Sequence, residues 1–99
     1  MASYRIEVTE DAKVDLSYYT AFERKLIASE IREQLTQQPL VETKNRKSLR
    51  DTPIASWELR IGKCRVFYEV NEPAQMVSIV SVGHKEHNIL FIGGKEVQI

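Results

Sequence analysis

The N-terminal part of the chain changes from a strand pattern to two helical patterns. Apolar and polar side chains alternate over residues 3–9 (SYRIEVT), which predicts a strand with one apolar side. Thr9 is suited to cap a following helix, whose apolar positions recur at helical spacing: Ala12, Leu16 and Tyr19. A second helix is predicted to begin at the capping box Thr20–Glu23 and to end near Pro39. We expect its apolar positions to face inward: Phe22, Leu26, Ile27, Ile31 and Leu35.

The pattern then changes to that of a loop and a β-hairpin. Residues 39–56 are polar and basic without a clear period, so they are predicted to form a loop. The stretch WELRIGKCRVFYEV (57–70) predicts two strands joined by Gly62-Lys63, with glycine at the first central position of a type II′ turn.

A two-residue loop fixes the register of this hairpin, with Arg60 opposite Arg65 and Glu58 opposite Phe67. One face is then apolar and is expected to pack against the helices: Trp57, Leu59, Ile61, Cys64, Val66, Tyr68 and Val70. The other face is expected to be half open to water: Glu58, Arg60, Arg65, Phe67 and Glu69.

The rest of the chain completes an α+β pattern. MVSIVSV (76–82) is β-branched and largely apolar, which predicts a central strand, and the remainder is predicted to be a short C-terminal segment broken at Gly93-Gly94. We therefore expect one domain over residues 1–99, with an N-terminal strand and a two-helix hairpin packed on a mainly antiparallel sheet.

Charge is uneven along the chain although the net charge is zero. Residues 42–65 carry seven bases and three acids, a local net charge of +4, and a local basic patch attracts polyanions. No apolar run reaches the roughly 20 residues of a membrane span, and no basic-then-apolar leader follows Met1. Cys64 is the single cysteine, which excludes an internal disulfide and fits a reducing cytoplasm.

The arginine pair admits two interpretations. Like charges directly opposite one another destabilise a strand pair, so Arg60 and Arg65 suggest an anion between them, with Phe67 able to stack on a base. The simpler interpretation is a solvated face on which nearby glutamates pair with the arginines, and such exposed pairs contribute only ~0–1 kcal/mol. The residues alone leave both open.

Three stretches resemble the RelE/ParE superfamily of toxins from bacterial type II toxin–antitoxin systems: NRKSLR (45–50), WELRIGKCRVFYEV (57–70) and VSVGHKEHNILFIGGKEV (80–97). The resemblance implies a RelE-like fold and a cytoplasmic toxin, not attached to a membrane, that is neutralised by an antitoxin in a hetero-oligomer. It also implies a ribosome-dependent endoribonuclease that cleaves mRNA and inhibits translation. In such enzymes the ribose 2′-OH attacks the adjacent phosphate, and no metal or cofactor is required.

The resemblance assigns basic catalytic positions and also shows departures. Arg65 and Lys85 match basic positions of the family, and Arg60 matches an arginine that recurs before the turn. The RelE branch has a lysine where Glu58 stands and a catalytic tyrosine where Phe91 stands. Phenylalanine can stack on an RNA base but cannot transfer a proton, so the RelE mechanism does not carry over intact.

Other branches use carboxylates and histidines for proton transfer, and this chain offers Glu58, His84 and His87. The spacing of His87 from Phe91 resembles that in one of these branches, which implies His87 as the acid, with His84 as the alternative. Glu58 either accepts the 2′-OH proton or holds Arg65 in place. The two histidines lack a third ligand, so we expect no zinc site.

The remaining expectations concern RNA contacts and alternative functions. Loop cations are expected to contact the RNA backbone: Lys44, Arg46, Lys47 and Arg50. The simpler alternative for them is a solvated loop. Within the superfamily, the alternatives are a ParE-like inhibitor of DNA gyrase and a non-catalytic, degenerate toxin that only binds antitoxins.

Overall fold

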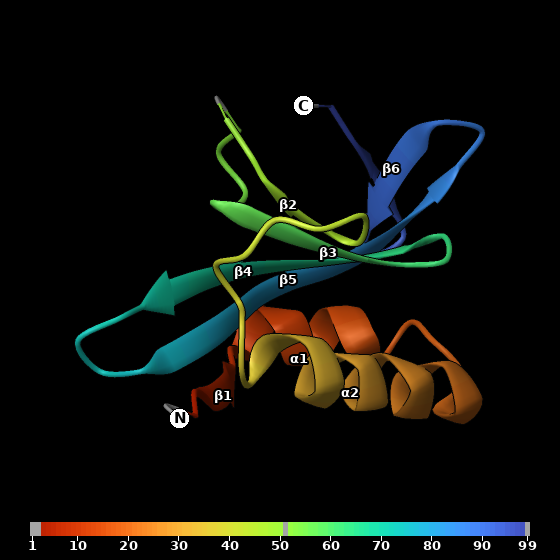
Figure 1. The fold of residues 1–99 in the computed structure, drawn as a ribbon. Coiled ribbons are helices and arrows are strands. Elements are labelled where there is room, and N and C mark those ends of the chain that lie inside the picture. Colours follow the sequence, from red (N-terminus) through yellow and green to blue (C-terminus); the bar gives the residue numbers. More distant parts are fainter. Residues whose placement is uncertain (1–2, 51, 99) are drawn as a thin grey trace.

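The fold places two helices on one side of a seven-stranded sheet (Figure 1). The computed structural model describes residues 3–50 and 52–98. In chain order, the elements are β1 (Arg5–Val8), α1 (Glu10–Leu16), α2 (Ala21–Leu35), β2 (Arg46–Ser48), β3 (Trp57–Ile61), β4 (Cys64–Asn71), β5 (Met76–Glu86), β6 (Ile89–Ile92) and β7 (Lys95–Val97). This arrangement confirms the predicted α+β class, with an N-terminal strand and a helical hairpin on a mainly antiparallel sheet. Neither helix in these ranges is long and apolar enough to cross a membrane.

Both helices begin at the predicted caps. Thr9 Oγ1 accepts a hydrogen bond from the Ala12 backbone N–H at 3.2 Å. Thr20 Oγ1 accepts from the Glu23 N–H at 3.1 Å, and Glu23 Oε1 accepts from the Thr20 N–H at 2.9 Å. These bonds satisfy N–H groups that have no partner within the first helical turn. The capping signals therefore position the helical hairpin.

The buried side of α2 is narrower than predicted. Ile27, Ile31 and Leu35 are buried, whereas Phe22 and Leu26 are 77% and 47% exposed. An α-helix turns about 100° per residue, so when the Ile27 side chain faces the core, the Leu26 side chain is directed about 100° away from it. The prediction of an inward position is wrong for Phe22 and Leu26.

The central strand β5 carries two partners on one edge. β1 runs parallel to it at Met76–Ile79 and β6 runs antiparallel to it at Gly83–Glu86, while β4 covers the other edge. Asp15 of α1 lies between β1 and β6, where its Oδ2 accepts from the Val82 N–H at 3.0 Å and from Ser81 Oγ at 2.9 Å. These bonds fix α1 against the middle of the sheet.

The β3–β4 hairpin has the predicted register, with Arg60 opposite Arg65 and Glu58 opposite Phe67. Gly62 has a φ of 58°, which the first central position of a type II′ turn requires. The predicted inward face packs into the main core under the helices. Its fully buried or largely buried members are Leu59, Ile61, Cys64, Val66 and Tyr68, with Trp57 and Val70 packed against them.

Three short strands lie where none was predicted, and β5 continues past Val82 to Glu86. β2 lies inside the predicted loop, where its inward position is Arg46 rather than an apolar residue, so no alternation of apolar residues marks it. β6 and β7 lie in the predicted C-terminal segment, and Gly93-Gly94 is the turn between them. The expectations of a loop at β2 and of an irregular tail are therefore wrong.

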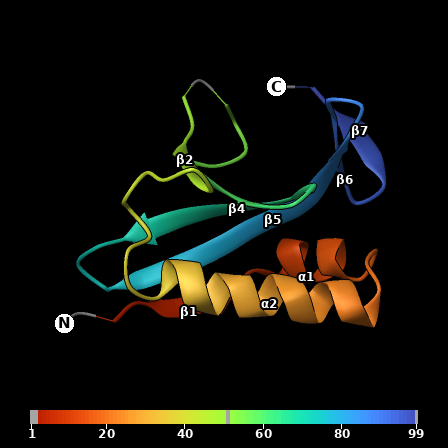
Figure 2. The ribbon, with the colours of Figure 1, turned by 45° about the vertical axis from the view of Figure 1, so that its right-hand side comes forward.

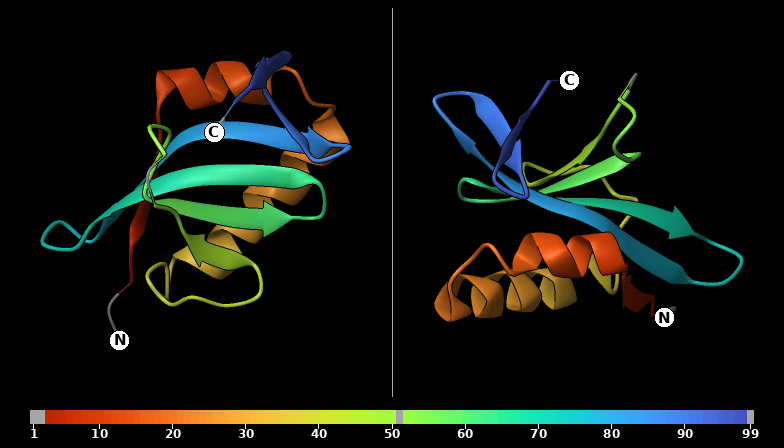
Figure 3. Two further views of the ribbon diagram at one scale, coloured as in Figure 1. Left: turned by 90° about the horizontal axis from the view of Figure 1, so that it is seen from above. Right: turned by 180° about the vertical axis from the view of Figure 1, so that it is seen from behind.

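The sheet face away from the helices holds a second, smaller core. Phe67 is fully buried there and packs with Ala55 and Leu90. The described residues between β2 and β3 (49–50 and 52–56) and the β6–β7 hairpin form two arms on this side of the sheet (Figure 2 and Figure 3). The expectation that this face is half open is wrong for Phe67 and Glu58, which are 0% and 4% exposed; residues of these arms cover Phe67.

Candidate functional site

A row of cations runs across the sheet face away from the helices. Residues directly opposite one another in antiparallel strands share a face. Arg60 lies opposite Arg65, which lies opposite Gly83; Gly83 lies opposite Ile92, and Ile92 opposite Lys95. Arg60, Arg65 and Lys95 therefore belong to one face of the curled sheet.

Two more cations join this row by the same reasoning. Lys47 lies opposite Glu58, and Lys85 lies two residues from Gly83 on the same strand, so both share the face of Arg65. We call this set the cationic face: Lys47, Arg60, Arg65, Lys85 and Lys95. Lys95 was missed by the sequence reasoning, although alternation after the Gly93-Gly94 turn would have located it.

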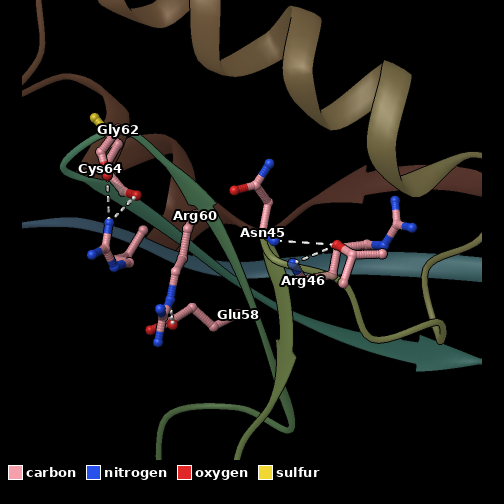
Figure 4. A network of polar contacts seen from close by, with 8 residues as sticks. Asn45, Arg46, Glu58, Arg60, Gly62 and Cys64 are labelled. Carbon is pink, nitrogen blue, oxygen red and sulfur yellow. Dashed lines mark hydrogen bonds and ion pairs between the residues drawn. The ribbon is translucent and has the colours of Figure 1, made fainter.

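Glu58 is a buried carboxylate within the cationic face. Its Oε2 accepts a hydrogen bond from Arg60 Nε at 2.8 Å, and its side chain is 5% exposed against 45% for Arg60. Figure 4 shows both side chains on the side of β3 that faces away from the helix. A charge that is buried without a hydrogen-bonded partner of opposite sign destabilises the fold. Glu58 therefore holds Arg60 and not Arg65, the partner that one prediction gave it.

The side chain of Arg65 is hydrogen-bonded to the backbone of the β3–β4 turn. Its Nη1 donates to the carbonyl oxygens of Gly62 at 2.8 Å and Cys64 at 2.9 Å. Its Nε is buried and has no hydrogen-bond partner among the described residues. A buried donor without an acceptor costs about 1–3 kcal/mol. Such an orphan donor is a feature that an anionic ligand would satisfy.

A cleft of about 300 Å³ adjoins Lys85 at the β6–β7 arm, and its lining includes Leu90, Glu96 and Val97. Gly83 lets this arm come close to β5: a Cβ at Gly83 would clash with the Phe91 backbone oxygen and lie 2.8 Å from Ile92 Cγ1. A larger residue at position 83 would therefore displace the arm that carries Lys95.

The four loop cations separate into different environments. Lys44 and Arg50 are exposed on either side of β2, and Lys47 belongs to the cationic face. Arg46 is only 7% exposed; it donates to Val41 O, Gln34 O and Gln34 Oε1 at 2.8–2.9 Å. The prediction that Arg46 contacts RNA is wrong, because its guanidinium ties the loop to the end of α2.

His84 and Phe91 lie on the opposite, helix-side face. His84 lies opposite Cys64 and Phe91, and its ring stacks on Phe91 at 5.6 Å between centroids. His84 Nδ1 is 2.7 Å from Tyr19 Oη, so one of these atoms donates to the other. His84 Nε2 lies 3.5 Å from Glu86 Oε1. Strand alternation thus separates His84 and Phe91 from Arg65.

The second histidine lies in the turn after β5. His87 and Asn88 have φ values of 52° and 67°, the pattern of a type I′ hairpin turn, and His87 is exposed. β5 continues to Glu86, so His84 and not His87 lies opposite Phe91, while His87 lies in the turn between β5 and β6.

Burial also determines the protonation of groups near His84. Desolvation raises the pKa of the Cys64 thiol, and burial likewise raises the pKa of the Tyr19 phenol. Both groups are therefore neutral at physiological pH, and Cys64 is not an activated nucleophile. Within residues 3–50 and 52–98, no three His, Cys, Asp or Glu side chains are grouped to hold a metal ion.

A family model identifies the class of protein to which this chain belongs. The model of the ParE toxin of type II toxin–antitoxin systems matches residues 6–89. The chain belongs to this toxin family. The match extends from β1 to the first residue of β6, so it includes the helical hairpin and most of the cationic face.

Solved structures show the same fold for the toxin. A chain of the RelBE2 toxin–antitoxin complex from Mycobacterium tuberculosis is 24% identical, with a TM-score of 0.75 over 86% of this chain and 94% of that chain. A chain of the archaeal RelE–RelB complex from Pyrococcus horikoshii OT3 is 21% identical, with a TM-score of 0.68 over 86% and 98%. No curated protein matches the chain. The fold is therefore RelE-like.

Proposed function

We propose that this toxin is an endoribonuclease that binds mRNA on the cationic face and cleaves it through the ribose 2′-OH. The observation that carries the proposal is the placement of five cations on one face of the sheet, with Glu58 buried beside Arg60 and an orphan buried N–H on Arg65. Arginine and lysine contacts to phosphate supply most of the affinity in nucleic-acid binding. Lys44 and Arg50, exposed beside β2, extend this surface along the RNA backbone.

The chemistry requires charge stabilisation at phosphorus. The 2′-oxygen forms a bond to phosphorus, and the bond from phosphorus to the 5′-oxygen breaks, which leaves a 2′,3′-cyclic phosphate and a 5′-OH. The phosphorane carries extra negative charge, and fixed cations stabilise it in the transition state. We assign this role to Arg60, Arg65 and Lys85. The planar guanidinium of each arginine suits two phosphate oxygens.

Two protons must also move, one from the 2′-OH and one to the 5′-oxygen. Glu58 holds Arg60 through Oε2, and we assign its other oxygen, Oε1, to accept the 2′-OH proton. We assign His87, in the exposed turn two residues beyond Lys85, to protonate the leaving oxygen. His84 is excluded from this role because it contacts Tyr19 on the opposite face. Phe91 is excluded from base stacking there for the same reason.

The proposed partners follow from the family and the fold. Membership in a type II toxin–antitoxin family supports a cognate antitoxin as binding partner in a hetero-oligomer. The solved complexes with similar folds also contain a toxin and an antitoxin. We further propose the ribosome as the site of mRNA cleavage, which places the toxin in the cytoplasm.

The test is induced expression followed by primer extension on cellular mRNA. We expect new 5′ ends within codons for the unchanged toxin and about 100-fold fewer for Arg65→Ala, since one lost oxyanion donor costs about 10²–10³ in rate. Lys25→Ala is the matched control, because Lys25 is an exposed cation on α2 away from the cationic face. Full cleavage by a folded Arg65→Ala toxin would overturn the assignment.

A second candidate is inhibition of DNA gyrase, and the ParE family match is the observation that favours it. Zero net charge also fits a protein target more easily than a highly charged ribosome. Intact mRNA together with induction of DNA-damage signalling would favour gyrase, whereas intact mRNA and normal growth would favour a degenerate toxin.

A further inference from the structure

The short connection between α1 and α2 contacts the far end of the sheet through two consecutive tyrosines. This connection, residues 17–20, begins at the C-cap of α1 and ends at the N-cap of α2. Its backbone is tied to both helices, because the Tyr18 N–H donates to Asp15 O at 3.1 Å and the Tyr19 carbonyl accepts a hydrogen bond from Arg24 Nη1. The helical hairpin therefore fixes the points from which the two tyrosine side chains extend.

Tyr19 contacts the end of β5 through His84. The Tyr19 side chain is buried, and its hydroxyl lies 2.7 Å from His84 Nδ1, with the two rings edge to face. Burial raises the pKa of the Tyr19 phenol, so the hydroxyl keeps its proton. The Glu86 carboxylate, 3.5 Å from His84 Nε2, favours a proton on that nitrogen, so the hydroxyl donates to Nδ1 of a neutral imidazole. Since this imidazole also stacks on Phe91 of β6, Tyr19 fixes a side chain that touches both strands.

His84 is adjacent in sequence to a residue of the cationic face. Because side chains alternate along β5, Lys85 lies on the opposite face of the sheet, where the proposed function assigns it to the phosphorane. The Lys85 N–H donates to Lys63 O at 2.9 Å, in the turn whose Gly62 carbonyl accepts a hydrogen bond from Arg65 Nη1. A displacement of β5 at His84 would therefore move Lys85 and the turn that holds Arg65.

Tyr18 lies against the turn of the β6–β7 arm. A Cβ atom built on Gly94 would lie 3.3 Å from Tyr18 Cε2. A Cβ atom built on Gly93 would lie 3.9 Å from Tyr18 Cε1 and 3.5 Å from Asp15 Oδ1. The glycines therefore let the backbone of this turn approach the ring with no side chain between them. Lys95 of the cationic face follows the turn directly, so Tyr18 supports the arm that carries Lys95.

We propose that the connection between the helices positions two cations of the cationic face for RNA cleavage. Tyr19 acts on Lys85 through the imidazole of His84. Tyr18 acts on Lys95 through the glycine turn. The inference rests on the nuclease function proposed above, to which it adds two positioning residues that do not touch the RNA. Lys85 stabilises the transition state, whereas Lys95 contacts the RNA backbone, so Tyr19 determines kcat and Tyr18 determines KM.

The first test measures the rate of mRNA cleavage on purified ribosomes against substrate concentration. Tyr19→Phe removes only the hydroxyl and should lower kcat at least about tenfold, because a misplaced cation loses contact with the phosphorane. Tyr18→Ala should raise KM about three- to tenfold, with kcat within about twofold. The matched controls are Tyr4→Phe, before β1, and Phe22→Ala, at a 77% exposed position, and both constants should stay unchanged in them. Wild-type kcat for Tyr19→Phe and wild-type KM for Tyr18→Ala would overturn the proposal.

A double-mutant cycle separates positioning from a general loss of stability. His84→Ala should lower kcat per folded molecule as Tyr19→Phe does. The double variant should lose no more than either single variant, because the two side chains act as one unit. His84→Asn keeps an oxygen acceptor for the Tyr19 hydroxyl and should restore most of kcat. Additive losses, or equal kcat for His84→Ala and His84→Asn, would contradict action through the imidazole.

Hydrogen exchange tests the same positioning without using activity. In Tyr18→Ala and Tyr19→Phe, we expect the amides of residues 84–97 to exchange at least about fivefold faster, while the amides of β3 stay unchanged. Wild-type exchange over residues 84–97 in both variants would overturn the inference, whatever the toxin cleaves. If the unchanged toxin made no cuts in mRNA while exchange changed as expected, the proposed nuclease would fail and the positioning of the cationic face by the two tyrosines would stand.

Discussion

Phe67 and Tyr68 are consecutive residues of β4 that face opposite sides of the sheet, and both are fully buried. Tyr68 lies in the main core under the helices, stacks on Trp57 at 6.0 Å between ring centroids, and donates a hydrogen bond to Pro39 O at 2.7 Å. Phe67 lies under two arms of irregular chain and short strands, in a core of far fewer residues. The sheet is therefore covered on both faces, by different kinds of structure.

The face of the sheet that the two arms cover is the face on which charged side chains remain accessible to solvent. On the helix side, a large apolar core packs the sheet against the helices, and His84, whose side chain is 20% exposed, contacts Tyr19. On the other side, the arms cover Phe67 but leave Arg60 exposed and Arg65 half-buried. A partly desolvated position strengthens interactions between such cations and an anionic ligand. The face away from the helices is therefore the better candidate for binding an anionic substrate.

Among the substitutions considered, the largest loss of folding stability is expected at Phe67, on the side of the sheet that the arms cover. We expect Phe67→Ala to lower the free energy of unfolding by about 3–5 kcal/mol, as for a Phe→Ala change in a full core. Phe22→Ala removes the same side chain from a position that is 77% exposed, and it should change stability by less than about 0.5 kcal/mol. Urea denaturation measures both. Equal small effects would mean that the arms do not form a core.

Arg46 and Arg50 provide the next contrast, because both were predicted to contact RNA. Arg46→Ala should cost on the order of 3 kcal/mol, since buried acceptors left without a donor cost about 1–3 kcal/mol each. Arg50→Ala should leave the melting temperature unchanged but weaken RNA binding, and the effect should diminish at high salt. A stable, fully folded Arg46→Ala protein would show that water replaces the three bonds.

Within the cationic face, we expect Arg60 to contribute more to folding stability and Arg65 to contribute more to RNA cleavage. Arg60→Ala leaves the buried Glu58 without its partner and should cost about 1–3 kcal/mol. Arg65→Ala removes a buried donor that has no acceptor, so it should cost less stability than Arg60→Ala while it loses more cleavage. Thermal unfolding and primer extension on the same pair of variants measure this. The reverse order would reassign the anion site to Arg60.

Short sequence motifs correctly predicted the start of α2 and the turn of the β3–β4 hairpin. The Thr20–Glu23 capping box and the Gly62-Lys63 turn were correct, because each depends on hydrogen bonds and dihedral angles within a few residues. β2 was missed because Arg46 is its inward residue, and a buried arginine depends on acceptors at Val41 and Gln34 that sequence spacing does not reveal.

The candidate site was predictable in part for the same reason. Alternation correctly placed Arg60 and Arg65 together, because hairpin register is local. It could not place His84 and His87, because their faces depend on where β5 ends and where β6 turns back. The resemblance supplied residue types, whereas only the three-dimensional pairing separated Arg65 from Phe91.

The smallest expected effect concerns the cap of α2 on the helix side. Hydrogen bonds from Thr20 lower the pKa of Glu23 from its ordinary value of 4.5. A lowered pKa in the folded state means that Glu23 stabilises the fold above its unfolded pKa, and that this contribution is lost as the pH falls through the folded pKa. Glu23→Gln should therefore lower the melting temperature at about pH 7 by more than at about pH 3.

Glu33→Gln is the control for that measurement, because Glu33 is exposed on the same helix and forms no ion pair within the described ranges. It should show no such difference between the two pH values. An identical loss for Glu23→Gln at both would mean that the cap acts through the shape of the side chain rather than its charge. In that case the charge of Glu23 would contribute nothing to stability, and the helix side would depend on packing and on the neutral hydrogen bonds of the cap.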